Sequence, residues 1–148
     1  MKIKNAVLYF IPLVLFYISG CGGGPETINV SLHCDADCNE SNAVVIKIYQ
    51  LRNADKFSHA SFESLQRNPD ATLGDDLLAG AKYEKLMAPD ETFKISEYEI
   101  KKDAAYIGVV GDFHTPSTDG WLQIIPVKGI GDVSIKIHSN SLSVQEGE

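Results

Sequence analysis

The distribution of hydrophobic and polar residues divides the chain into an apolar N-terminal segment and a longer region with the rhythm of β-strands. In residues 27–33, every second residue is apolar, which is the period of a strand with one buried face. Residues 104–113 are nearly all apolar, which is typical of a central strand buried on both faces. Further apolar or alternating runs predict strands over 43–51, 82–87, 92–98, 121–127, 132–138 and 141–144.

Residues 55–69 interrupt the strand pattern. A serine, Ser58 or Ser61, could cap a short helix that ends before Pro69. Residues 75–78 are expected to begin a further helical turn. Neither helix is long enough to be stable alone in water, so both are expected to pack on a sheet. The whole pattern predicts a mainly β protein, a β-sandwich of about eight strands with a short inserted helical segment.

Composition limits the classes of function. The chain has 148 residues, of which 44% are hydrophobic, and this is enough for a packed core in one domain. The 13 Lys and Arg against 20 Asp and Glu give a formal net charge of −7. A nucleic-acid-binding protein would need clustered cationic residues, so that function is not expected. The 3 cysteines are too few for a disulfide scaffold or a four-cysteine zinc site.

The N-terminal segment has the features of an export signal. Lys2 and Lys4 precede an apolar run over residues 6–18. This run is shorter than the roughly 20 helical residues that cross a bilayer, but it fits the apolar core of a secretory signal. It ends in Ile18-Ser19-Gly20-Cys21, which resembles the bacterial lipobox. An ordinary secretory signal with a chance cysteine, or a single N-terminal anchor, remains an alternative.

The lipobox predicts three parts of the chain: a lipoprotein signal peptide over residues 1–20, a lipidated flexible tether over 21–26 and a folded domain over 27–148. Bacterial lipoproteins carry several acyl chains on the cysteine that here is Cys21, and two or more chains anchor a protein stably. The next residue is Gly22 rather than the aspartate that retains lipoproteins at the inner membrane. The expected location is therefore the periplasmic face of the outer membrane.

Several segments of the mature chain together resemble the TssJ family, the outer-membrane lipoproteins of type VI secretion systems. Their order and spacing after a lipobox carry the resemblance, which covers most of the mature chain. The matching pieces are Val44-Val45-Ile46-Lys47-Ile48-Tyr49-Gln50-Leu51, Phe57 with Phe62 and Leu65, Leu73-Gly74-Asp75-Asp76-Leu77-Leu78, Tyr106-Ile107-Gly108-Val109-Val110-Gly111-Asp112-Phe113, and Trp121.

The resemblance implies a transthyretin-like sandwich of two four-stranded sheets with added helical elements. It also implies a function without enzymatic activity. The protein would anchor the secretion trans-envelope complex at the outer membrane by binding the periplasmic domain of TssM, in a complex that also contains TssL. In the family, the loop between the first two strands is a main contact for TssM. Here that loop is residues 34–42, and its candidate partner-binding residues are Asp35, Ala36, Asp37, Asn39 and Glu40.

Two cysteines in this loop depart from the general pattern of the family. Once exported, Cys34 and Cys38 face an oxidising compartment, so an intraloop disulfide is expected, contributing roughly 2 kcal/mol through chain entropy. His33 beside them invites a metal site, but the spacing of the cysteines does not fit a zinc motif. No metal or cofactor is therefore expected apart from the covalent lipid. The acidic residues of the loop could equally form a solvated turn.

Two other functions can be compared with the adaptor hypothesis. His59, His114 and His138 are isolated along the sequence, and no nucleophile motif accompanies them, so catalysis is not expected. The alternative is a periplasmic carbohydrate- or lipid-binding lipoprotein of unrelated function. That hypothesis requires exposed aromatic side chains on one surface, and its candidates are Tyr83, Tyr98 and Trp121.

Overall fold

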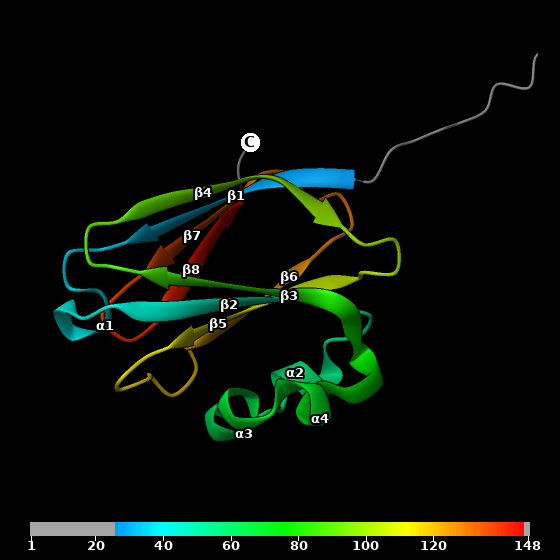
Figure 1. The fold of residues 1–148 in the computed structure, drawn as a ribbon, viewed down its shortest axis with the longest axis horizontal. Coiled ribbons are helices and arrows are strands. Elements are labelled where there is room, and N and C mark those ends of the chain that lie inside the picture. Colours follow the sequence, from blue (N-terminus) through cyan, green and yellow to red (C-terminus); the bar gives the residue numbers. More distant parts are fainter. Residues whose placement is uncertain (1–25, 147–148) are drawn as a thin grey trace, which may run out of the picture.

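The computed structural model describes residues 26–146, which form two four-stranded sheets packed face to face (Figure 1). This arrangement confirms the predicted eight-stranded sandwich. The predicted signal peptide, the lipidation residue Cys21 and the tether as far as Pro25 lie outside the described residues. The first strand begins at Glu26, the last residue of the predicted tether.

The first sheet, called sheet A here, has the strand order β4-β1-β7-β8. Its strands are β1 (Glu26–Cys34), β4 (Thr92–Ile100), β7 (Val133–Ile137) and β8 (Leu142–Glu146). β1 pairs antiparallel with β4 on one side and parallel with β7 on the other. The first strand of the domain is therefore an inner strand, with hydrogen-bonded neighbours on both sides.

The second sheet, sheet B, has the order β3-β2-β5-β6, and all of its neighbours are antiparallel. Its strands are β2 (Val44–Leu51), β3 (Leu77–Met87), β5 (Tyr106–Asp112) and β6 (Leu122–Pro126). The apolar run predicted to form a central strand is β5, which lies between β2 and β6 and has five consecutive buried residues.

The core fills the space between the two sheets and continues between sheet B and the inserted helical segment, and alternate residues of the strands contribute to it. In β1, Ile28, Val30 and Leu32 are buried, as the alternating pattern predicts. Burying each such side chain contributes about 1.5–3 kcal/mol relative to leaving it exposed. The largest members of the core have less than 2% of their surface exposed: Tyr49, Phe57, Leu32, Ile46, Ile48, Leu51, Leu65, Leu73, Met87, Ile135 and Ile137.

The inserted helical segment covers part of the outer face of sheet B (Figure 1). It contains α2 (Asp55–Ser58), α3 (Phe62–Arg67), α4 (Pro69–Leu73) and the 3₁₀-helix η1 (Gly74–Asp76). Each helix is too short to be stable alone. Phe57, Leu65 and Leu73 anchor the segment, with 0%, 1% and 0% of their surface exposed.

The ends of these helices follow local side-chain chemistry. Ser61, rather than Ser58, caps α3, because its Oγ atom accepts a hydrogen bond from the backbone N–H of Ser64 at 3.2 Å. Pro69 follows the end of α3 and is itself the first helical residue of α4. Proline suits that position because its missing N–H would have no helical partner.

The predicted helical turn over residues 75–78 is wrong in its second half. The 3₁₀-helix ends at Asp76, and Leu77 begins β3, where it pairs with Leu51. Short apolar runs do not distinguish a helix from a strand, and here pairing with β2 decides. β3 also contains a bulge, because Tyr49 pairs with Lys82 while Leu51 pairs with Leu77.

The sandwich has two distinct ends. Glu26, where the tether joins, lies at one end, and β1 runs from there to Cys34 at the other (Figure 1). The β1–β2, β3–β4, β5–β6 and β7–β8 connections all lie at this second end, called the loop end here. Among the helices described in residues 26–146, none is long and apolar enough to span a membrane.

Candidate functional site

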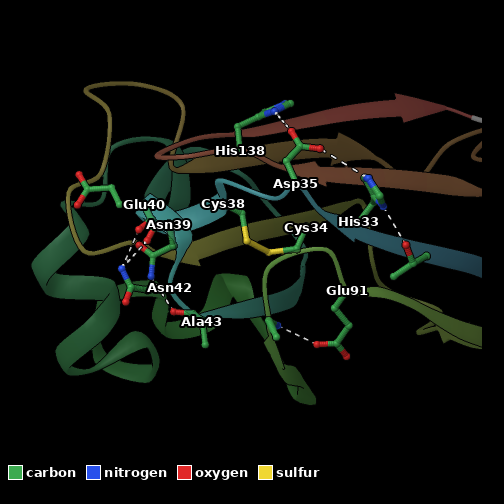
Figure 2. The surroundings of a disulfide bond; sticks show 12 residues. His33, Cys34, Asp35, Cys38, Asn39, Glu40, Asn42, Ala43, Glu91 and His138 are labelled. Carbon is green, nitrogen blue, oxygen red and sulfur yellow. Dashed lines mark hydrogen bonds and ion pairs between the residues drawn. A yellow bond between two sulfur atoms is a disulfide. The ribbon is translucent and has the colours of Figure 1, made fainter.

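The β1–β2 loop closes the loop end of the core. Cys34, the last residue of β1, forms a disulfide with Cys38, which begins the short turn α1 (Cys38–Ser41) (Figure 2). The S–S distance is 1.98 Å, and both side chains have 0% of their surface exposed. The disulfide is therefore part of the hydrophobic core and is not a surface link.

The turn after the disulfide has an unusual backbone. Asn39, Glu40 and Ser41 have φ angles of 47°, 56° and 62°, in the left-handed region that L-residues other than glycine rarely adopt. The buried side chain of Asn39 holds this turn. Its Nδ2 atom donates to the carbonyl oxygen of Ala43 at 2.7 Å, and its Oδ1 atom accepts from the backbone N–H of His114 at 2.7 Å.

The five predicted partner-binding residues have different surroundings. Ala36, Asp37 and Glu40 are exposed, and Asp35 is half-buried. Asn39 has only 5% of its surface exposed. The loop therefore offers Ala36, Asp37 and Glu40 to a partner, whereas Asn39 holds the loop in shape.

Asp35 joins two histidines that are far apart in the sequence. Its carboxylate lies 2.7 Å from Nδ1 of His138 and 3.6 Å from Nε2 of His33 (Figure 2). The other ring nitrogens contact hydroxyl groups, His138 at Ser143 and His33 at Thr92, each at 2.8 Å. His138 is isolated along the sequence, and no sequence signal points to this contact across 103 positions.

Ser143, His138 and Asp35 are connected in the order of a catalytic triad, and all three are half-buried. Ser143 lies on β8, an edge strand of sheet A. Two surface hollows in the described part of the chain, of about 610 and 250 Å³, include none of the three residues in their linings. Within residues 26–146, no group of acidic, histidine or cysteine side chains could hold a metal ion. The contacts connect the β1–β2 loop, the β7–β8 turn and β8.

Backbone hydrogen bonds join the four connections of the loop end into one unit. Cys34 N–H donates to the carbonyl oxygen of Glu91 in the β3–β4 turn at 2.9 Å. Asn39 N–H donates to the carbonyl oxygen of His138 at 3.2 Å. Ser117 N–H, in the β5–β6 loop, donates to that of Asn140 at 3.0 Å. The loop end is therefore a preordered surface.

The loop end is mainly acidic. Lys85 forms an ion pair with Glu91 at 2.9 Å, and the backbone N–H of Ala88 donates to the Glu91 carboxylate at 2.8 Å. The hydrogen bond from Ala88 and then the Lys85 ammonium lower the pKa of Glu91 below its usual value. Asp37, Glu40, Asp90 and Asp119 are exposed, and none of them forms an ion pair within the described part of the chain.

The three aromatic residues of the carbohydrate-binding alternative do not form a platform. Trp121 has 7% of its surface exposed and packs edge-to-face on Phe62, with ring centroids 5.3 Å apart. Tyr83 and Tyr98 contact each other across the open side of the sandwich, but their rings lie at 81°. Stacking on a sugar needs an exposed flat surface, so this arrangement disfavours the alternative.

The fold and the loop end define a class of protein: a rigid β-sandwich that presents a set of ordered loops, as binding modules do. A family model described as type VI secretion lipoprotein, with the members VasD, EvfM and TssJ, matches residues 26–142. The chain belongs to this family. No curated protein matches the chain in sequence.

Solved structures show the same fold. The chain is similar to the type VI secretion lipoprotein TssJ1 from Pseudomonas aeruginosa, with 21% identity and a TM-score of 0.76 over 84% of this chain and 98% of that one. It is also similar to Serratia marcescens Lip, described as a membrane-bound component of the type VI secretion system, with 19% identity and a TM-score of 0.67 over 80% and 96%.

A third match is a chain of a structure described as the TssM C-terminal domain (869–1107) from EAEC, with 18% identity and a TM-score of 0.70 over 82% and 98%. At these identities the similarities establish the fold. Membership of the family establishes that the chain is a structural lipoprotein component of a type VI secretion system. The family is not enzymatic and has no cofactor.

Proposed function

We propose that this lipoprotein anchors the trans-envelope complex of a type VI secretion system at the periplasmic face of the outer membrane. Acyl chains on Cys21 would hold it in the membrane, and the β1–β2 loop would bind the periplasmic domain of TssM, in a complex that includes TssL. Membership of the type VI secretion lipoprotein family supports this assignment, because the resemblance to that family implies TssM as the partner.

The observation that carries the proposal is the preordered β1–β2 loop at the end of the sandwich opposite Glu26. The disulfide, the buried Asn39 side chain and the hydrogen bonds to neighbouring loops fix this segment before any partner arrives. A preordered loop loses less conformational entropy on binding, so more of the contact energy contributes to affinity. Its exposed residues Ala36, Asp37 and Glu40 are then available for contact.

The test reverses two exposed charges of the loop. Asp37→Lys combined with Glu40→Lys should weaken binding of the full-length lipoprotein, purified in detergent, to the TssM periplasmic domain by about tenfold or more. The side chains of Asp37 and Glu40 make no hydrogen bond or ion pair within the described residues, so the thermal midpoint should not change. Affinity can be measured by biolayer interferometry.

A matched control reverses a charge at the other end of the sandwich. Asp103 has 67% of its side chain exposed and forms only a long contact of 3.9 Å with Arg52. Asp103→Lys should therefore bind TssM as the wild type does. If the folded double variant also binds with wild-type affinity, Asp37 and Glu40 belong to a solvated turn and this assignment of the interface fails.

A further inference from the structure

The outer face of sheet B is arranged in rows of paired side chains, and the inserted helical segment covers only some of these rows. Tyr49 of β2 pairs with Lys82 of β3 and Gly108 of β5, so the three lie in one row. This row is under the helices, because Phe57 of α2 packs on Gly108 and contacts the Tyr49 ring at a centroid distance of 6.1 Å.

The next row marks the limit of the helical cover. Lys47 of β2 lies one row closer to the loop end than Tyr49, and it pairs with Glu84 and Val110. Its Nζ atom donates a hydrogen bond to Oε1 of Gln66, which belongs to α3. This hydrogen bond connects α3 to the row. Glu84, the member of the row that lies on β3, is exposed.

The last row before the loop end is open to solvent. Leu86 of β3 pairs with Val45, and Val45 pairs with Asp112 of β5. Paired side chains on one face of an antiparallel sheet lie about 5 Å apart, so the three form a continuous strip. Leu86 has 59% of its surface exposed and is the only large hydrophobic side chain classed as exposed in residues 26–146. Val45 and Asp112 are half-buried.

Carboxylates border the apolar part of the strip on two sides. Glu84 is two residues from Leu86 on the same face of β3, and Asp112 lies beyond Val45. Neither forms an ion pair with another group in the described part of the chain. An apolar surface bordered by carboxylates complements an apolar side chain that has a lysine or arginine beside it.

The strip is continuous with the candidate partner-binding loop. Val45 is the second residue of β2, and only the buried Val44 separates it from the exposed residues Asn42 and Ala43 at the end of the loop. Leu86 pairs with Val45, so it lies on the strand beside the one that leaves the loop. The exposed apolar surface and the loop are therefore neighbouring parts of one accessible region.

We propose that the row of Leu86, Val45 and Asp112, called the Leu86 strip, is a second part of the partner interface. Leu86 and Val45 receive an apolar side chain from a basic segment of the same protein partner. This inference rests on the proposed function, because it extends the surface through which the partner binds. It assigns the specificity of the contact to a sheet face, and not only to the loop.

The test replaces Leu86 by threonine, a residue that favours strands but lacks most of the apolar contact surface of leucine. Full-length Leu86→Thr protein in detergent should bind the TssM periplasmic domain about tenfold more weakly, as expected for loss of one buried leucine contact. Leu86→Met should bind within about twofold of the wild type, because its apolar volume is similar.

The control places threonine on the exposed face of the other sheet. Lys94→Thr on β4 should leave the affinity unchanged, and all three variants should keep the wild-type thermal midpoint because their side chains are exposed or conservatively replaced. If Leu86→Thr binds as the wild type does while Asp37→Lys with Glu40→Lys does not, the Leu86 strip is overturned and the loop assignment stands. If both variants bind normally, both assignments fail.

Discussion

Single polar side chains, the half-buried Asp35 and the buried Asn39, connect the parts of the loop end, and the sequence does not reveal these contacts. Asp35 is predicted as a partner contact because it lies in the loop that contacts TssM in the family, and its carboxylate also contacts His138 from the β7–β8 turn. Asn39 is included for the same reason, and its amide joins Ala43 to His114. Both contacts depend on which strands are neighbours, and residue types along one loop carry no information about that.

Tyr49 provides a test at the same scale. Its hydroxyl group is buried and makes no hydrogen bond to any described residue. Burial, followed by the charge of Glu84, raises the pKa of Tyr49 to about 12. Because a buried hydroxyl without a partner is destabilising, Tyr49→Phe should raise the free energy of unfolding by about 1 kcal/mol in urea denaturation at neutral pH.

The pH dependence of Tyr49→Phe gives a second measurement. The raised pKa means that the folded protein holds the phenolic proton more tightly than the unfolded chain, so this contribution to stability is lost as pH rises from about 10 to 12. The variant should lose less stability over that range. Tyr83→Phe, at a half-buried position, should change unfolding by less than about 0.5 kcal/mol. A large loss of stability in Tyr49→Phe would contradict this account.

At the scale of elements, strand periodicity predicts the sandwich well, whereas irregular pairing cannot be predicted. The alternating runs in β1 and β7 correspond to one buried face, which is a property of the strand itself. The start of β3 escapes prediction because Leu77 and Leu78 fit a helix or a strand equally well. The bulge near Gly80, at φ of 64°, escapes it too, because it depends on how β2 and β3 pair.

The contact between the helical segment and sheet B can be tested at Gly108. A Cβ atom at this position would lie 2.6 Å from the Cζ atom of Phe57, closer than real contacts allow. Gly108→Ala should therefore lower the free energy of unfolding by about 1–3 kcal/mol in urea denaturation. In the double variant with Phe57→Leu, the smaller side chain leaves room, so the combined loss should be smaller than the sum of the two single losses. Strict additivity would show that the ring is not the obstacle.

The β3–β4 turn should contribute to stability in a pH-dependent way. The pKa of Glu91 is lowered in the folded protein by the Ala88 hydrogen bond and the Lys85 ion pair. A lowered pKa stabilises the fold above the usual carboxyl pKa, and this stabilisation is lost as pH falls through the folded value. Glu91→Gln should thus show a smaller drop in thermal midpoint between neutral pH and about pH 3. Glu99→Gln, on β4, serves as the control, and an equal drop in both variants and the wild type would refute the assignment.

At the scale of the whole molecule, the order of the chain separates the two proposed attachments. The predicted lipidation site is five residues before Glu26, at the end of the sandwich opposite the β1–β2 loop. β1 has 9 residues. At about 3.3 Å per residue it separates the two ends by roughly 27 Å. A partner bound at the loop end would thus be held away from the lipid surface.

The proposed lipid attachment at Cys21 predicts how single substitutions change the location of the protein in the cell envelope. Cys21→Ser should not incorporate labelled palmitate and should be absent from the outer-membrane fraction, because no acyl chain would be attached. Gly22→Asp should remain acylated but move to the inner membrane, as the sorting rule for bacterial lipoproteins implies. Labelling followed by sucrose-gradient fractionation checks both outcomes. An acylated Cys21→Ser protein, or an outer-membrane location for it, would exclude Cys21 as the site.

The inner position of β1 has a mechanical consequence. The same strand follows the tether at Glu26 and leads into the disulfide at Cys34, so a pull between membrane and partner would act along its axis. The covalent backbone of β1 would carry this pull, and hydrogen bonds to β4 and β7 on either side would keep the strand within the sheet. Because β1 is already close to full extension, a pull between Glu26 and Cys34 would lengthen this link very little.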